Sequence, residues 1–183
     1  MNIEEFNSHW PDGLLKDFPM RLMGVRGYFL DEGIEKVNDM GIFDDAIFRC
    51  IDKEVTMWRA STDPGRYYIA HPLNPSGCAQ LRPGLSFYRL GRHLNNHDAL
   101  VQGEEFTVNR LDQTGKVIGI DRGYFGINMH SGGAEYQVGR WSAGCQVIQC
   151  PEGAWGATWQ AFFQPIQSIA PKRIPYLLIE DEA

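Results

Sequence analysis

The sequence predicts a mainly β fold with one C-terminal helix, a β-rich α+β class that we expect to form a sandwich. Short segments of strand-forming residues recur from residue 44 onward, separated by turn residues, and the chain contains 20 glycines and 10 prolines. One long helical period follows Cys150. No repeat, low-complexity tract or linker interrupts the 183 residues. We therefore expect a single domain spanning 1–183, with residues 1–20 as an N-terminal arm.

The N-terminal arm carries large apolar residues at four-residue spacing, namely Phe6, Trp10, Leu14 and Phe18. This spacing is typical of an amphipathic helix. Residues 11–13 read Pro-Asp-Gly, which is a turn signal. The sequence leaves two interpretations open: a helix interrupted at this turn, or a hooked arm packed by Trp10.

The predicted strands follow in order along the chain. They are residues 46–51, 54–60, 67–70, 84–90, 99–102, 105–110 and 124–129. The first two flank Asp52 and Lys53, so we expect them to form a β-hairpin.

The predicted helix begins near Pro151, a residue well suited to a first helical turn, and Glu152 complements the positive end of the helix dipole. Its apolar stripe consists of Trp155, Trp159, Phe162, Phe163 and Ile166. We expect this stripe to face the core and the helix to end at Pro165 and Pro171. A last strand over residues 174–179 is expected at a sheet edge.

The net charge of −6 argues against a nucleic-acid partner, because phosphate binding needs clustered Lys and Arg. The longest basic run is Lys172-Arg173. No window approaches the roughly 18 apolar residues of a membrane span, so none is expected. The first residues lack the basic and apolar regions of a signal peptide. We expect synthesis in the cytoplasm, with any action in the periplasm or cell wall depending on separate delivery by a partner that the sequence does not identify.

The four cysteines, Cys50, Cys78, Cys145 and Cys150, contain no C-x-x-C pair. A disulfide framework is not expected in a chain of this size without an export signal. A zinc site can be drawn from Cys145, Cys150, His130 and either His71 or His93, but the spacings match no compact zinc motif. We therefore expect no metal and no cofactor, and we expect Cys50, Cys78 and Cys150 to be core residues.

Cys145 and His130 are the candidate catalytic pair. Residues 126–133 read Gly-Ile-Asn-Met-His-Ser-Gly-Gly, which places His130 at a strand end before a turn, and residues 142–145 read Ser-Ala-Gly-Cys. A thiol needs a neighbouring base to react well at neutral pH. Gly144 lacks a Cβ and lets a substrate carbonyl approach, so the amides of Gly144 and Cys145 are expected to form an oxyanion hole.

These residues resemble the catalytic motif of the L,D-transpeptidase (YkuD-type) family. His130 and Ser131 match its leading histidine and the next residue, while Ser142, Gly144 and Cys145 match its terminal Ser-His-Gly-Cys motif after a similar interval. The resemblance implies a YkuD-like, largely β catalytic domain that acts on peptidoglycan stem peptides. It also implies a cysteine that forms a thioacyl-enzyme, which an amine or water resolves. The leading histidine is implied to act as base, with its imidazole tautomer fixed by a backbone carbonyl just after it, that of Ser131 or Gly132.

The sequence departs from the family pattern at two positions, so it resembles a divergent branch. Ala143 replaces the second histidine of the motif, and Val147 stands where Arg or Asn is common. Recognition of the stem-peptide carboxylate must therefore differ, and Arg140 and Gln146 are the nearby candidates. The remaining candidates for substrate binding are Ser142, Gly132 and His93.

Other functions stay open at this point. The changes at Ala143 and Val147 suggest a catalytically silent wall-binding or structural component, such as a phage or secretion-system protein. A cysteine peptidase or amidase with another substrate is a further alternative, although papain-like and NlpC-type enzymes place Cys before His. Asp44-Asp45 and Thr62-Asp63 suggest paired carboxylates for glycoside cleavage, but strand capping and turn chemistry explain them. His93 and His97 flank a polar loop and are typical of surface residues, although one of them could line the cleft.

Overall fold

The computed structural model describes residues 1–29 and 38–180. In chain order the elements are α1 (Ile3–Ser8), α2 (Asp12–Asp17), β1 (Met20–Arg26), β2 (Asp45–Ile51), β3 (Glu54–Ser61), α3 (Arg66–Ala70), β4 (Cys78–Leu81), β5 (Gly84–His93), β6 (His97–Gln102), β7 (Phe106–Leu111), β8 (Val117–Gly123), β9 (Met129–Ser131), β10 (Gln146–Ile148), α4 (Ala157–Ile169) and β11 (Ile174–Glu180). The single-domain prediction over 1–183 includes residues 30–37 and 181–183, which lie outside the described part of the chain.

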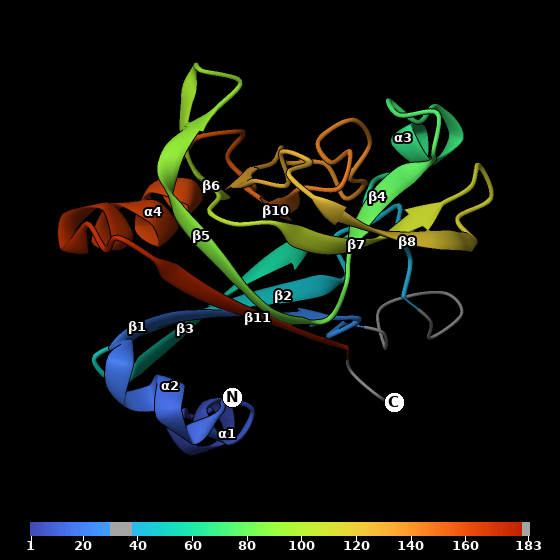
Figure 1. Cartoon of the computed structure of the whole chain (residues 1–183). Coiled ribbons are helices and arrows are strands. Elements are labelled where there is room, and N and C mark those ends of the chain that lie inside the picture. Colours follow the sequence, from blue (N-terminus) through green and yellow to red (C-terminus); the bar gives the residue numbers. More distant parts are fainter. Residues whose placement is uncertain (30–37, 181–183) are drawn as a thin grey trace.

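Eight strands form a closed barrel in the order β1-β11-β5-β6-β9-β10-β3-β2 (Figure 1). A separate three-stranded sheet, β4-β7-β8, lies beside it. The predicted mainly β class with a C-terminal helix is confirmed. The predicted sandwich is not, because the larger sheet closes on itself as a barrel.

The hairpin of β2 and β3 is confirmed, with Ile51 opposite Glu54. Asp52 and Lys53 both have positive φ, at 48° and 79°. Two-residue hairpin turns favour positive φ at both positions because their twist then matches that of the strands. The turn therefore forms despite the absence of the usual glycine.

The strand predicted over residues 67–70 is wrong, since these residues form the short helix α3. The backbone N–H of Ile69 donates to Gly65 O, which begins the helical turn. The strand predicted over 124–129 is also displaced, because regular pairing in β9 begins only at Met129. Tyrosine and isoleucine favour strands, but here local hydrogen bonds and tertiary packing override that preference.

The strand β11 lies inside the barrel, not at a sheet edge as predicted. It pairs in parallel with β1 and antiparallel with β5. The strand β1 was not predicted, although all seven of its residues are buried. Because both of its faces are covered, β1 lacks the alternation of apolar and polar residues that identifies a half-buried strand.

The C-terminal helix is confirmed, but it begins at Ala157 and continues through Pro165. Its buried residues are Trp159, Phe162, Phe163 and Ile166, as the stripe predicts. Proline has no N–H to bond the carbonyl four residues earlier. Arg49 of β2 supplies a replacement, because its guanidinium donates to Ala161 O at 2.8 Å and also to Phe162 O. Within the described residues, no helix has the length and apolar character needed to cross a membrane.

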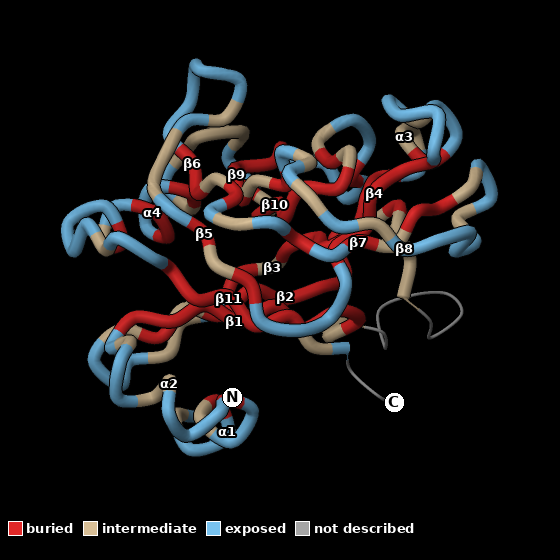
Figure 2. The backbone as a smooth tube through the Cα atoms, viewed as in Figure 1, coloured by how far each residue is buried: buried red, intermediate tan, exposed pale blue. Residues whose placement is uncertain are grey.

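The N-terminal arm forms two short helices, α1 and α2, below β1 in the view of Figure 1. Phe6 and Trp10 are buried and pack with Met23 and Phe48 of the barrel wall. Asp12 and Gly13 lie inside α2, so the predicted turn is shifted to the residues between the two helices. Figure 2 shows that many residues of the barrel strands are buried and that many residues of this arm are exposed.

Candidate active site

Parallel pairing of β9 and β10 brings the two catalytic candidates together. In the register of this pair, Val147 lies opposite His130. Cys145 directly precedes β10, two residues before Val147, and therefore lies close to His130. The backbone N–H of Gln146 donates to Asn128 O at 2.8 Å and extends the pairing toward Cys145. Figure 2 shows β9 and β10 among the buried strands of the barrel.

The Cys145 side chain is buried, with 8% of the residue exposed. Its Sγ accepts a hydrogen bond from the Asn128 N–H at 3.5 Å, and the thiol donates to Gly126 O at 3.6 Å. Burial raises the pKa of Cys145 to about 11. The sulfur is therefore held as a thiol in the resting protein, and reaction requires a base that removes its proton during attack.

His130 has the arrangement expected of that base. Its Nδ1 lies 2.8 Å from the carbonyl oxygen of Ser131, so the ring carries its proton on Nδ1 and leaves a lone pair on Nε2. Among the described residues, Nε2 has no hydrogen-bond partner. Burial, followed by the neighbouring His93, lowers the pKa of His130 to about 3, which keeps the imidazole neutral.

His93 at the end of β5 lies against this pair. Its ring stacks on that of His130 with centroids 4.1 Å apart and planes inclined by 24°. The ligand atoms of His93, His130 and Cys145 all lie within 4.8 Å of one another. Burial, followed by His97, lowers the pKa of His93 as well. His97 itself stacks on Trp155, with centroids 4.2 Å apart.

Cys145 and His93 line a cleft of about 450 Å³. Its apolar part includes Leu73, Ala79, Tyr124, Phe125 and Ile127, and its polar part includes Asn74 and Arg110. The Arg110 guanidinium donates to Asp121 Oδ2 at 2.8 Å and lies over the Phe125 ring at 4.7 Å. His93 was predicted to line the substrate site, and the structure places it in the wall of this cleft.

The predicted oxyanion hole changes at Gly144. Its N–H donates to Ser142 Oγ at 3.1 Å and is not directed to a substrate. Gly144 has φ of +126°, and a Cβ at this position would lie 2.4 Å from Ala79 O. Glycine is required here by backbone conformation and close packing. Cys145 N–H is left as the backbone donor for an oxyanion.

Ser142 and Gln146 lie in the interior and not in the cleft, contrary to their predicted role in substrate binding. Ser142 Oγ lies 2.7 Å from Asp63 O and 2.8 Å from Cys145 O, so it fixes the loop before Cys145. Gln146 is fully buried, and its Oε1 accepts from the Tyr176 hydroxyl at 2.8 Å. The contacts of both side chains in the structure are with other parts of the protein interior.

Arg140 and Gly132 also lie away from the cleft. The Arg140 guanidinium lies 4.0 Å from the Tyr67 ring centroid and lines a separate hollow with Trp141. Gly132 N–H donates to Ile148 O at 2.7 Å, and a Cβ there would lie 2.7 Å from Val147 Cγ1. Ser131 contributes its carbonyl to His130, while its hydroxyl lies 3.1 Å from Cys150 Sγ and accepts from the Trp155 N–H.

Sequence reasoning missed Asn128 and Arg110. Asn128 contacts Cys145 and His93, because its N–H donates to Cys145 Sγ and its Nδ2 lies 3.2 Å from His93 Nδ1. Its position two residues before His130 is the only sequence signal for this role. Arg110 comes from the small sheet, and nothing in its sequence context indicates that it lines the cleft.

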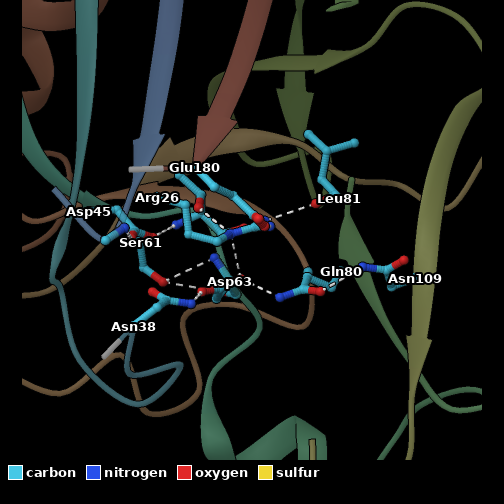
Figure 3. Close-up of polar contacts among 12 residues, drawn as sticks. Arg26, Asn38, Asp45, Ser61, Asp63, Gln80, Leu81, Asn109 and Glu180 are labelled. Carbon is cyan, nitrogen blue, oxygen red and sulfur yellow. Dashed lines mark hydrogen bonds and ion pairs between the residues drawn. The ribbon is translucent and has the colours of Figure 1, made fainter. Parts of the chain in front are cut away.

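A polar network centred on the buried residues Arg26 and Asp63 contacts the segment before Cys145, and Figure 3 shows the contacts of these two residues. Arg26 Nε lies 3.0 Å from Asp63 Oδ1, and its other nitrogens donate to Glu180 Oε1 and Leu81 O. Asp63 O in turn lies 2.7 Å from Ser142 Oγ. The network therefore connects the barrel wall to the segment that carries the cysteine. This connection explains Asp63 better than the carboxylate pair considered from the sequence.

The raised pKa of Cys145 predicts the pH dependence of its reactivity. We expect alkylation of Cys145 by iodoacetamide in EDTA to accelerate about tenfold per pH unit between roughly pH 7 and 10, because only the thiolate reacts. Peptide mass spectrometry of quenched samples measures this rate. A rate that stays constant from about pH 6 to 9 would indicate a preformed thiolate–imidazolium pair and contradict a thiol whose pKa burial has raised. Urea-unfolded protein is the control, since its rates should level off near pH 8.5 to 9.

The candidate site is defined by the chemistry of its residues. Its distinguishing features are the buried thiol of Cys145, the neutral imidazole of His130 held by Ser131 O, and the adjoining cleft. The chain matches no protein-family model, no curated protein and no solved structure.

Proposed function

We propose that the protein is a cysteine-dependent enzyme of the L,D-transpeptidase type that transfers or hydrolyses acyl groups of peptidoglycan stem peptides. The observation that carries this proposal is the pair of Cys145 and His130, with Ser131 O on Nδ1 and Nε2 left without a partner among the described residues. The order and spacing of the motif around this pair support the choice of substrate class. The same proposal includes a YkuD-like catalytic domain, which would differ from the expected sandwich because its larger sheet closes as a barrel.

The proposed reaction begins when Cys145 Sγ attacks the carbonyl of the bond between an L-centre and a D-residue. His130 Nε2 takes the thiol proton as the carbon–sulfur bond forms, and Cys145 N–H donates to the oxyanion. When the tetrahedral intermediate collapses, the carbon–nitrogen bond breaks and His130 returns the proton to the leaving amine. The product is a thioester, which an acceptor amine or water resolves through the same base.

Concerted proton transfer suits these groups better than a preformed ion pair. The pKa of Cys145 is raised to about 11 and that of His130 is lowered to about 3, both mainly by burial. The proton therefore stays on sulfur until attack begins. This is the situation of a serine nucleophile with its histidine base, in which neither group is charged at rest.

The cleft supports a peptide substrate. Apolar side chains such as Leu73 and Tyr124 are exposed at 77% and 69% around it, and can pack along an extended peptide. Arg110 also lines the cleft, where its guanidinium pairs with Asp121 and donates to Gly77 O. We propose it, in place of Arg140 or Gln146, as the residue that recognises the stem-peptide carboxylate. Because the proposed substrate is peptidoglycan, the proposed site of action is the periplasm or cell wall. The protein would reach it through a separate delivery route.

The test is incubation of the protein with purified muropeptides that carry tetrapeptide stems, followed by mass spectrometry. Loss of the terminal D-residue, exchange of a D-amino acid, formation of cross-linked dimers or cleavage of dimers each supports the proposal if Cys145→Ala abolishes it. Cys78→Ala is the matched control, because Cys78 is the other thiol that lines the cleft. The absence of any Cys145-dependent product on all stem types tested would overturn the proposal.

A second candidate function is a wall-binding component without catalysis. It is favoured by the Gly144 N–H, which bonds Ser142 Oγ in place of a substrate, and by the high pKa of Cys145. In this case the folded protein would bind muropeptides without changing them, and iodoacetamide would modify Cys145 no faster than the buried Cys50.

A further inference from the structure

Three potential metal ligands from three separate segments converge beside the cleft, and two of them, His93 and Cys145, line it. His93 ends β5, His130 lies in β9, and Cys145 directly precedes β10. Their ligand atoms lie within 4.8 Å of one another. His130 is 2% exposed, and its Nε2 is a buried polar atom without a partner among the described residues. An unpartnered buried nitrogen beside a thiol and a second imidazole calls for an explanation.

We propose that His93, His130 and Cys145 form a Zn²⁺ site with three protein ligands and an open fourth position facing the cleft. Imidazole nitrogen and thiolate sulfur are the ligands that Zn²⁺ prefers, and three protein ligands with one open position are typical of reactive zinc sites. On binding, the Cys145 thiol loses its proton to solvent and forms a Zn–S bond, while both histidines bind as neutral rings.

The contacts around the three residues resemble the outer shell of a zinc site. Ser131 O holds Nδ1 of His130, which fixes the tautomer that presents Nε2 to the metal. The Asn128 side chain lies at Nδ1 of His93 and leaves the other nitrogen of that ring for coordination. The Asn128 N–H donates to Cys145 Sγ, as amides commonly do to metal-bound thiolates. One residue, Asn128, thus orients two of the three ligands.

Binding requires a small movement of His93. Tetrahedral coordination with Zn–N of about 2.0 Å and Zn–S of about 2.3 Å separates the ligand atoms by roughly 3.3–3.6 Å, which is less than the 4.8 Å within which the three ligand atoms lie. The stacked rings of His93 and His130 must also turn so that both lone pairs meet at one point. His93 is half-buried and adjoins the exposed turn at Leu94, so its side chain is the one that has room to turn.

The site goes beyond the proposed function, since metal binding needs only these three side chains and no acyl substrate. The cleft supplies the entry path, because both His93 and Cys145 line it. Zinc bound here would engage the Cys145 sulfur and the His130 lone pair together. The metal-loaded and metal-free forms should therefore differ in the reactivity of Cys145.

The test is a competition titration of the full-length, metal-free protein with Zn²⁺ and a chromogenic chelator. We expect one equivalent of Zn²⁺ to bind, with affinity at least about 100-fold weaker in His93→Ala and in Cys145→Ala. His97→Ala and Cys78→Ala are matched controls that should bind like the original protein. Binding that is equally tight in His93→Ala and the original protein would overturn the proposal.

A second readout avoids dependence on variants. Co²⁺ added to the original protein should give intense visible bands of a tetrahedral site together with a sulfur-to-cobalt charge-transfer band, and Zn²⁺ should abolish both. Zn²⁺ should also protect Cys145, but not Cys78, from iodoacetamide. Absence of the cobalt bands and of this protection would contradict the metal site whatever the muropeptide assay shows. Muropeptide turnover in EDTA tests the proposed acyl transfer separately.

Discussion

Replacement of His130 by alanine is expected to slow Cys145-dependent conversion of muropeptides by about 10²–10⁴-fold, the usual contribution of a positioned general base. Burial raises the pKa of Cys145 to about 11, and in the proposed mechanism His130 Nε2 is the base that removes the thiol proton. We expect kcat to decrease, while the affinity for muropeptide changes little. Steady-state kinetics with mass-spectrometric detection measures both parameters.

His97→Ala is the matched control for this prediction. His97 lies on the neighbouring strand β6, is exposed, and stacks on Trp155 in place of contacting Cys145. Its loss should leave kcat within about twofold of the original value, as expected for a surface residue. Equal losses in the two variants would mean that His130 acts only through the local packing of its ring.

Replacement of Arg26 by methionine is expected to lower the free energy of unfolding by about 3–5 kcal/mol, since it leaves a buried carboxylate without its partner. The side chains of Arg26 and Asp63 are 3% and 1% exposed, and their charged atoms are 3.0 Å apart (Figure 3). Arg26 also donates to Thr62 O and Leu81 O, which would lose these bonds. Urea unfolding followed by tryptophan fluorescence measures the change.

Glu180→Gln provides the control for the same network. Glu180 contacts Arg26 at 2.9 Å, but its side chain is 55% exposed. Solvent screens such a pair, so its loss should cost no more than about 1 kcal/mol. If Arg26→Met lowers the free energy of unfolding as little as Glu180→Gln does, the buried pair of Arg26 and Asp63 does not stabilise the barrel.

Local features of the fold could be predicted because their signals lie within a few residues. The hairpin around Asp52 and Lys53 follows from two apolar segments with a two-residue connection. The buried face of α4 follows from the spacing of Trp159, Phe162 and Ile166. In each case the period of the apolar residues matches that of the element.

Closure of the barrel could not be predicted, because it depends on distant pairing. The strand β1 contacts β11 more than 150 residues later in the chain, with Leu22 opposite Tyr176. It also contains Arg21 and Arg26, whose charges suggest an exposed segment although both residues are buried. The partners of Arg26, which include Asp63 and Glu180, explain why its charge is tolerated inside the protein.

The candidate site was predictable in its two central residues and less so in its surroundings. The motif identifies His130 and Cys145, and it anticipates the contact of Ser131 O with the imidazole. It does not distinguish residues that face the cleft from those that hold the loop, so Ser142 and Gln146 were assigned to the substrate. Both side chains lie in the interior, where Ser142 Oγ donates to Asp63 O and Gln146 Oε1 accepts from the Tyr176 hydroxyl.

The most direct test of the central claim is the mass of the protein during turnover. In EDTA, rapid mixing with a tetrapeptide muropeptide and acid quenching should yield an adduct equal to the muropeptide without its terminal D-residue. The adduct should map to Cys145, release with hydroxylamine as a thioester does, and be absent from Cys145→Ala. Conversion of the muropeptide by a protein that never carries this adduct, or an adduct at another residue, would contradict acyl transfer through Cys145.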